Sequence, residues 1–282
     1  MTSTSHTAWV EEQDSVRVET SYHEFDVAYR EEGTGDPVTL FIHGIPTWGY
    51  LFREVYTAAD HAVVPDLAGY GYTEHLGEGG YDRSIRLQEE LVEGFLDELG
   101  HDSVQIVAHD IGGGTALRLA THSPERVERL VLSNAACYDN WPVPFIHEQG
   151  RPDEAREWTG KDVDEKLQFV FGEGTVGDEN AEFVAGMKAP FLERDRDPRA
   201  LARNAVSTNT NHTLEVAHLV SDVDVPALLL WGGDDVLVST KWADRLATDL
   251  PDAEQEYLDD AYHWVMQDRP EAYRTALEGF LD

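Results

Sequence analysis

The sequence has little cysteine and little lysine. Cys137 is the single cysteine among 282 residues. One cysteine excludes a disulfide framework and any metal site built from several cysteines. The 12 histidines include no H-E-x-x-H pattern and no close metal-ligand spacing. We therefore expect neither a catalytic metal nor a cofactor.

Long apolar runs are also missing. No stretch approaches the ~18 residues that a membrane-spanning helix needs. Residues 1–6 (MTSTSH) have neither the basic segment nor the apolar segment of a secretory signal. These two absences predict a soluble, cytoplasmic protein with no membrane partner.

Positive charge is scarce, because 21 Lys and Arg stand against 55 Asp and Glu and give a formal net charge of −34. Such a surface repels phosphate backbones, which excludes nucleic acid as a partner. At ~0.1 M salt the acidic groups repel one another, whereas at ~1 M salt a Debye length of about 3 Å screens them. The composition thus predicts a protein of a salt-rich cell, and an ordinary acidic enzyme is the alternative.

What the sequence does contain is a regular alternation of buried strands and helices. The length and the 41% hydrophobic content are enough for one large domain with a substantial core. Strands that alternate with helices predict an α/β fold with a mostly parallel sheet covered on both faces. The expected strands are 16–19, 25–30, 38–42, 62–65, 103–108, 130–133, 227–231 and 254–258, and the expected helices are 48–59, 84–99, 112–121 and 270–281.

The alternation stops at about Asp139. From there to about His212 the chain has acidic helical segments and scattered aromatic residues, but no convincing apolar strand. We interpret this stretch as a helical insertion in the α/β core. The expected domains are a core of residues 1–138 and 215–282 and a helical cap of residues 139–214.

A sharp strand-to-helix turn, residues 108–112 (AHDIG), carries an aspartate at its centre. Small residues on both sides let the chain turn tightly and present Asp110 at the carboxyl end of the sheet, as in a nucleophile elbow. No G-x-S-x-G motif occurs, so a serine hydrolase would lack its nucleophile. A carboxylate can displace a leaving group from saturated carbon and form an ester. The plainer alternative is an aspartate that caps the following helix.

Acids and a histidine follow further along the chain. Asp235 comes just after a buried strand, with Asp234 as its solvated neighbour, and His263 precedes the last helix. The order of nucleophile, acid and base predicts that His263 activates water and that Asp235 orients it. The backbone amides of Ile45 and Ile111 are expected to form an oxyanion hole.

Together these residues resemble the α/β-hydrolase superfamily, and within it the branch with an aspartate nucleophile. Residues 43–53 (HGIPTWGYLFR) look most like haloalkane dehalogenases, and residues 66–71 (DLAGYG) are similar to the superfamily's D-L-x-G-x-G loop. The resemblance covers residues ~20–138 and ~215–282 and implies an α/β-hydrolase fold with a helical cap. It also implies hydrolysis of haloalkanes to alcohol and halide through an aspartyl ester, without a cofactor.

The sequence departs from the dehalogenases at the residues that hold the departing halide. That family usually places Trp after the nucleophile and a second side-chain donor, Asn or Trp, elsewhere. The corresponding positions here are Ile111 and Ile45, whose side chains have no N–H group. The candidate replacements are Trp48, Trp141 and Trp158, and hydrophobic packing is the alternative role of each.

Epoxide hydrolases are the alternative relatives, because HGxP and His109 fit them. Their cap tyrosines protonate the epoxide oxygen, and Tyr138 is the one candidate at the cap here. Fluoroacetate dehalogenases share the elbow, but their arginines correspond to Ile111 and Gly114. An apolar pocket therefore favours a small neutral hydrophobic substrate, with His109 and Tyr138 as further candidate contacts. A scaffold that binds a ligand without turnover stays the third alternative, and no motif indicates the oligomeric state.

Overall fold

A single sheet runs through the computed structural model, which describes residues 5–75, 78–176, 181–192 and 197–281. Its eight strands follow the order β1-β2-β4-β3-β5-β6-β7-β8. β2 is antiparallel to both of its neighbours, and the other neighbouring strands are parallel, which confirms the expected mostly parallel sheet. The strands are β1 (Asp14–Glu19), β2 (Glu24–Gly33), β3 (Thr39–Ile42), β4 (His61–Pro65), β5 (Val104–His109), β6 (Val127–Ser133), β7 (Ala227–Gly232) and β8 (Ala253–Leu258).

The central strands are buried because helices cover both faces of the sheet. Every residue of β3, β5 and β7 is buried, whereas the edge strand β8 is largely exposed. This burial explains why the central strands are continuous apolar runs in the sequence. Outside the cap region the helices are α1 (His6–Glu11), α2 (Ile85–Leu99), α3 (Ile111–His122), α10 (Lys241–Asp249), α11 (Val265–Asp268) and α12 (Pro270–Leu281).

The helix expected over residues 48–59 is wrong. The chain forms two short 3-10 turns there, Gly49–Phe52 and Tyr56–Ala58. Glycine and aromatic residues are poor α-helix formers. In addition, Asp66 Oδ1 accepts a hydrogen bond of 2.8 Å from the Gly49 amide and so holds the chain in the turn.

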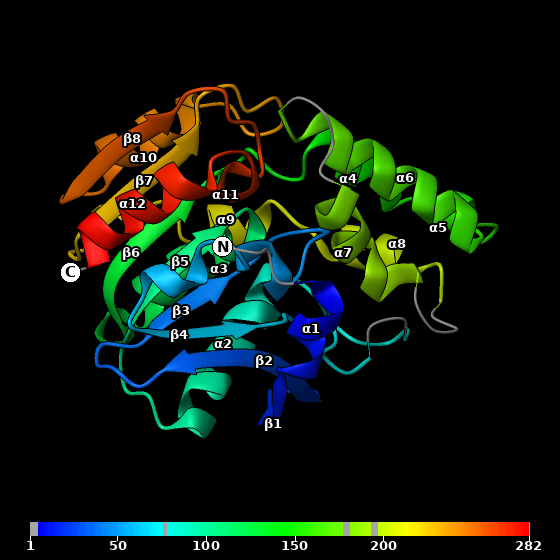
Figure 1. Cartoon of the computed structure of the whole chain (residues 1–282), viewed down its shortest axis with the longest axis horizontal. Helices are drawn as coiled ribbons and strands as arrows, with labels where there is room; N and C mark the ends of the chain where they lie inside the picture. Colours follow the sequence, from blue (N-terminus) through cyan, green and yellow to red (C-terminus); the bar gives the residue numbers. More distant parts are fainter. Residues whose placement is uncertain (1–4, 76–77, 177–180, 193–196, 282) are drawn as a thin grey trace.

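Residues 139–214 contain helices, and the described part of this stretch has no strand. Figure 1 shows α4 to α8 gathered to one side of the sheet, on the right of the view, while α9 lies against α2 and α3. The division into core and cap stays a prediction. The helices are α4 (Pro144–Gln149), α5 (Pro152–Ala155), α6 (Gly160–Glu173), α7 (Ala181–Leu192), α8 (Ala200–Ser207) and α9 (Asn211–Leu214).

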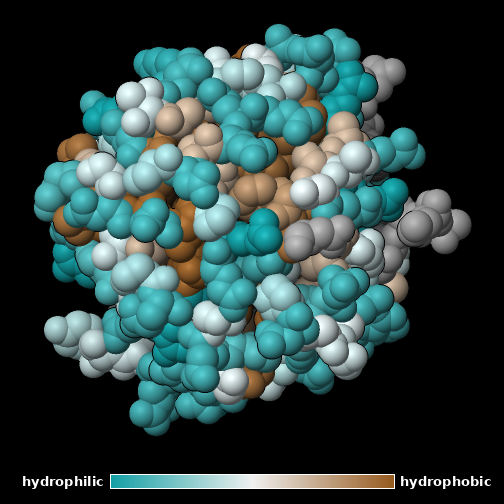
Figure 2. All heavy atoms as spheres, turned by 90° about the vertical axis from the view of Figure 1, so that its left-hand side faces the viewer, coloured by the Kyte–Doolittle hydropathy of each residue, from teal (hydrophilic) through white to brown (hydrophobic). Residues whose placement is uncertain are grey.

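Hydrophilic residues dominate the surface. The face in Figure 2 is largely hydrophilic, with hydrophobic residues exposed in a central strip. Arginines form many of the surface ion pairs, and Arg17 alone pairs with Glu24, Asp26 and Glu74. None of the helices in the described ranges combines the length and the hydropathy needed to cross a membrane.

Repulsion among the uncompensated acids predicts a salt-dependent stability. Lowering KCl from about 1 M to below about 0.1 M should lower the melting temperature, because less salt screens the acidic surface. Differential scanning calorimetry measures this change, with sucrose at matched osmolarity as the uncharged control. A melting temperature that does not depend on salt would contradict the assignment to a salt-rich cell.

Candidate active site

A tight turn between β5 and α3 presents the aspartate. Asp110 has φ 55° and ψ −121°, a conformation that costs a non-glycine residue energy and marks functional sites. Glycines make room for this turn. A Cβ added to Gly112 would lie 2.3 Å from the Ile42 carbonyl oxygen, and one added to Gly44 would lie 2.4 Å from the Asp110 side chain. The turn therefore requires glycine at both positions.

The two oxygens of the Asp110 carboxylate have different surroundings. The Ile45 amide donates a hydrogen bond of 2.8 Å to Oδ1. Oδ2 has no hydrogen-bond partner among the described residues and lies 3.7 Å from Nε2 of His263. Ile111 is the first residue of α3, so its N–H group has no partner within the helix. One oxygen is thus held by the backbone, and the other faces the imidazole.

A second carboxylate holds the other side of the imidazole. Nδ1 of His263 lies 3.0 Å from Asp235 Oδ2. The amides of Leu237 and Val238 donate to Asp235 Oδ1 at 2.6 and 2.9 Å. Since this carboxylate is an acceptor for its neighbours, we assign the proton between it and His263 to Nδ1. The structure places Asp235 beside the imidazole, whereas Asp234 is exposed.

Asn134 is a functional residue that the sequence analysis missed. It directly follows β6 and has a φ of 45°. Its Nδ2 donates to Asp235 Oδ2 at 2.5 Å, and its Oδ1 accepts from the Gly232 amide at 3.2 Å. Asn134 therefore ties the acid to the carboxyl ends of two neighbouring strands. An asparagine just after a buried strand was the signal that could have identified it.

Neighbouring charges and burial together set the pKa values of His263 and Asp235. Burial lowers the pKa of His263, but the carboxylates of Asp235 and Asp110 outweigh burial and raise it to about 10. Burial raises the pKa of Asp235. The charge of His263 and the hydrogen bonds to the carboxylate lower this pKa by more than burial raises it, so the net shift is downward. Burial lowers the pKa of His109 to about 3. The free protein therefore holds an imidazolium between two carboxylates, beside a neutral histidine.

His109 contacts the main chain and the ring of His263. Its Nε2–H donates to the main-chain carbonyl of His263 at 3.0 Å, and the two ring centroids are 4.7 Å apart. It is fully buried and does not line the active-site cavity. The structure thus places His109 against His263 and away from the cavity wall, and the substrate contact expected from the sequence stays a prediction.

Three other candidate contacts also lie away from the cavity wall. The indole N–H of Trp48 donates to the Gly186 carbonyl at 2.9 Å, so it is already used. The phenol of Tyr138 donates to Asp249 Oδ2 at 2.7 Å. Trp158 is half-buried and does not line the cavity. The structure thus places all three side chains away from the cavity wall, and their roles as substrate contacts stay predictions.

Trp141 does line the cavity, and so does Trp264, which the sequence analysis missed. Both are buried, and neither indole N–H has a hydrogen-bond partner among the described residues. The cavity volume is about 10 Å³, barely room for one water molecule. Apart from Asp110 and His263 its wall is apolar, with Ile45, Val143, Phe145, Ile146, Val170, Leu237 and Val238 completing it.

Tyr70, in the 66–71 loop, is a further residue that the sequence analysis missed. It is fully buried, and its phenol has no partner among the described residues. Its ring packs edge-on against His43 at 5.4 Å. Burial raises the pKa of Tyr70, and the negative charge of Asp110 raises it further. A neutral phenol is therefore held within electrostatic reach of the Asp110 carboxylate.

The described residues contain no group of three or more His, Cys, Asp or Glu side chains that could hold a metal ion.

Known proteins of one fold family but with differing activities are similar to this chain. A family model described as alpha/beta hydrolase fold matches residues 37–270. A haloalkane dehalogenase 2 of Mycobacterium bovis is 27% identical over 271 residues, which cover 89% of this chain and 90% of the relative. A cis-3-alkyl-4-alkyloxetan-2-one decarboxylase of Shewanella oneidensis is 24% identical, with coverages of 90% and 84%. The crystal structure of haloalkane dehalogenase DbeA from Bradyrhizobium elkani has a TM-score of 0.76 and 25% identity, with coverages of 95% and 97%.

The paired carboxylates predict how His263 titrates. In Asp110→Asn one of the two charges that raise the pKa of His263 is lost, so this pKa should fall from about 10. Titration of ¹⁵N-histidine-labelled protein by NMR measures it directly. Asp234→Asn is the matched control, because Asp234 is exposed and its loss should leave His263 unchanged. Identical titration of His263 in wild type and Asp110→Asn would contradict this account.

Proposed function

The chain belongs to the alpha/beta hydrolase fold family, and from its site we propose a hydrolase that forms a covalent ester on Asp110, with small haloalkanes as substrates. The observation that carries the proposal is Oδ2 of Asp110, which accepts no hydrogen bond from the described residues, lies beside His263 and belongs to the wall of a small apolar cavity. A neutral apolar molecule fits such a wall, because a charged one would be desolvated without a partner. The similarity to haloalkane dehalogenases supports the choice of leaving group.

In the first step, Oδ2 of Asp110 attacks the carbon that bears the halogen. A carbon–oxygen bond forms, the carbon–halogen bond breaks, and the halide leaves with the electron pair. A halide in an apolar cavity needs hydrogen-bond donors. The unpaired indole N–H groups of Trp141 and Trp264 are suited to this role. Trp141 is a replacement donor that the sequence suggested, and Trp264 is the second.

In the second step, water attacks the carbonyl carbon of the ester. Esterified Asp110 is neutral, so one of the two charges that raise the pKa of His263 is gone. The imidazolium then loses its proton to solvent, and neutral Nε2 takes a proton from the attacking water while Asp235 stabilises the new charge. The amides of Ile45 and Ile111 hold the developing oxyanion. Collapse breaks the carbon–oxygen bond to the alkoxy group, which leaves as the alcohol with the remaining proton of the attacking water, and restores the Asp110 carboxylate beside the His263 imidazolium.

Other leaving groups use the same attack. An epoxide needs a proton on its oxygen, but Tyr138 donates to Asp249 and none of the tyrosines in the described residues lines the cavity. A strained oxetan-2-one ring, on which the Shewanella oneidensis relative acts by name, leaves as a carboxylate and needs no proton. A scaffold that binds a ligand without turnover remains the third alternative.

Intact-protein mass spectrometry of His263→Ala tests the covalent step. Without its base the enzyme should stall as the ester, so incubation with haloalkanes should add the mass of the alkyl group alone. Addition of a whole epoxide or a whole oxetan-2-one would reassign the leaving group.

The double variant Asp110→Asn with His263→Ala is the control and should gain no mass from any substrate. A folded His263→Ala protein that gains no mass from all three classes would overturn the proposed function and favour the binding scaffold.

The two tryptophans predict a specific loss of leaving-group stabilisation. Trp141→Phe and Trp264→Phe should each lower kcat/KM for a chloroalkane by roughly tenfold to a hundredfold, because each removes one hydrogen bond to an anion. Assays in potassium sulfate keep the salt high without a competing halide. Trp158→Phe is the matched control, since Trp158 does not line the cavity, and should not change kcat/KM. Equal effects of all three variants would remove the leaving-group assignment.

A further inference from the structure

The main chain of Trp141 is held by the segment that returns from the cap region. The Thr210 hydroxyl donates to the Trp141 carbonyl oxygen. Three residues further on, the Thr213 hydroxyl donates to the Tyr138 carbonyl oxygen at 2.5 Å. These two bonds join the two ends of the predicted cap, with Tyr138 lying just before its first residue. The position of Trp141 therefore depends on where this returning segment lies.

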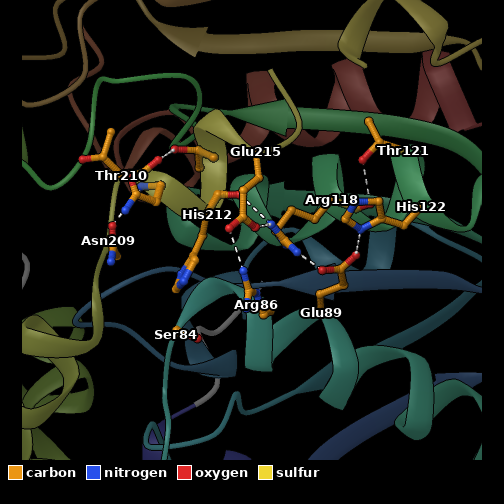
Figure 3. Close-up of polar contacts among 12 residues, drawn as sticks. Ser84, Arg86, Glu89, Arg118, Thr121, His122, Asn209, Thr210, His212 and Glu215 are labelled. Carbon is orange, nitrogen blue, oxygen red and sulfur yellow. Dashed lines mark hydrogen bonds and ion pairs between the residues drawn. The ribbon is translucent and has the colours of Figure 1, made fainter. Parts of the chain in front are cut away.

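The returning segment needs an external support. α9 has four residues, and a helix of that length is not stable alone. Arg118, on α3, donates to the His212 carbonyl at 2.7 Å and to Glu215 Oε2 at 2.9 Å. Its Nε donates to Glu89 on α2 at 2.6 Å. Figure 3 shows this guanidinium between the two carboxylates, with α9 beside it.

Arg118 is 4% exposed and Glu89 is 6% exposed, so water and salt screen their interaction little. Further contacts extend the cluster. Arg86 pairs with Glu215 at 2.6 Å, and His122 lies 2.5 Å from Glu89. The support of α9 thus rests on one buried ion pair, Arg118 with Glu89, from which Arg118 also reaches the exposed Glu215.

Helix α3, which carries Arg118, begins directly after Asp110, so it links α9 to Asp110. A Cβ added to Gly114 would lie 3.3 Å from Thr213 Cγ2 and 3.1 Å from the Ala136 carbonyl oxygen. The glycine lets the returning segment lie directly on the first turns of α3. A continuous set of contacts therefore runs from Asp110 along α3 to Arg118, through α9, and back to Trp141.

We propose that Thr210 is a positioning residue that, supported by Arg118, fixes the main chain of Trp141 relative to Asp110. In a cavity of about 10 Å³ a small shift of the indole changes both the room for substrate and the aim of the N–H group. The catalytic consequence rests on the proposed function. The positioning itself does not, because it concerns the indole in the free protein.

Fluorine NMR of protein labelled with 5-fluorotryptophan tests the positioning. Trp141→Phe identifies the Trp141 resonance by its loss. In Thr210→Val this resonance should shift or broaden, because the hydroxyl bond to the Trp141 carbonyl is gone. Thr210→Ser keeps the hydroxyl and should restore the wild-type resonance. Glu215→Gln weakens the support at Arg118 and should move the same resonance in the same direction, by less.

Thr275→Val is the matched control, because Thr275 makes an equivalent bond of 2.9 Å to the Glu271 carbonyl on distant α12. It should leave the Trp141 resonance unchanged. Kinetics supply the second readout, since Thr210→Val should lower kcat/KM for a haloalkane by roughly threefold to tenfold and Thr210→Ser should recover it.

The two proposals fail in different ways. A Trp141 resonance in Thr210→Val identical to that of the wild type would overturn the positioning role. The same follows if Thr275→Val shifts the resonance as much as Thr210→Val does. A shifted Trp141 resonance in a protein whose wild type turns over none of the substrate classes would support the positioning and overturn the proposed function.

Discussion

The active site depends on one buried cation held between two buried anions. His263 lies 3.7 Å from Asp110 and 3.0 Å from Asp235, and all three side chains are shielded from water. An isolated charge would be very costly there, so each member needs the others. Neutralising either carboxylate changes the proton affinity of the imidazole. In the proposed reaction, esterification of Asp110 turns a stable ion pair into a working base.

The surrounding fold keeps this charge balance in one geometry. β5, β6 and β7 end next to one another in the parallel part of the sheet, so Asp110, Asn134 and Asp235 meet at their carboxyl ends. Backbone amides fix the remaining carboxylate oxygens, and His109 holds the main chain of His263. The cap region adds apolar residues to the cavity wall and the unpaired indole N–H of Trp141, while Trp264 lies next to His263 in the core. The proposed leaving-group donors therefore come from both parts of the chain, Trp141 from the cap region and Trp264 from the core.

The strands and the meeting of Asp110, Asp235 and His263 could be predicted because their signals are local. Asp110 and Asp235 each follow a buried strand, and their order along the chain limits their roles. Trp264 and Tyr70 could not be predicted, because what distinguishes them is a polar group left unpaired by the packing around it. Trp48 shows the converse, since its N–H is used by Gly186, which is distant in sequence. Residue type alone does not show whether an indole N–H already has a hydrogen-bond partner in the fold.

The origin of the oxygen in the product tests the covalent route most directly. In a single turnover in H₂¹⁸O with excess enzyme, the alcohol should carry ¹⁶O from the Asp110 carboxylate, because water attacks the ester carbonyl and not the substrate carbon. The peptide that contains Asp110 should then gain ¹⁸O, as read by mass spectrometry after proteolysis. An alcohol that carries ¹⁸O from the first turnover, with an unlabelled Asp110 peptide, would contradict the account, because water would have attacked the substrate directly.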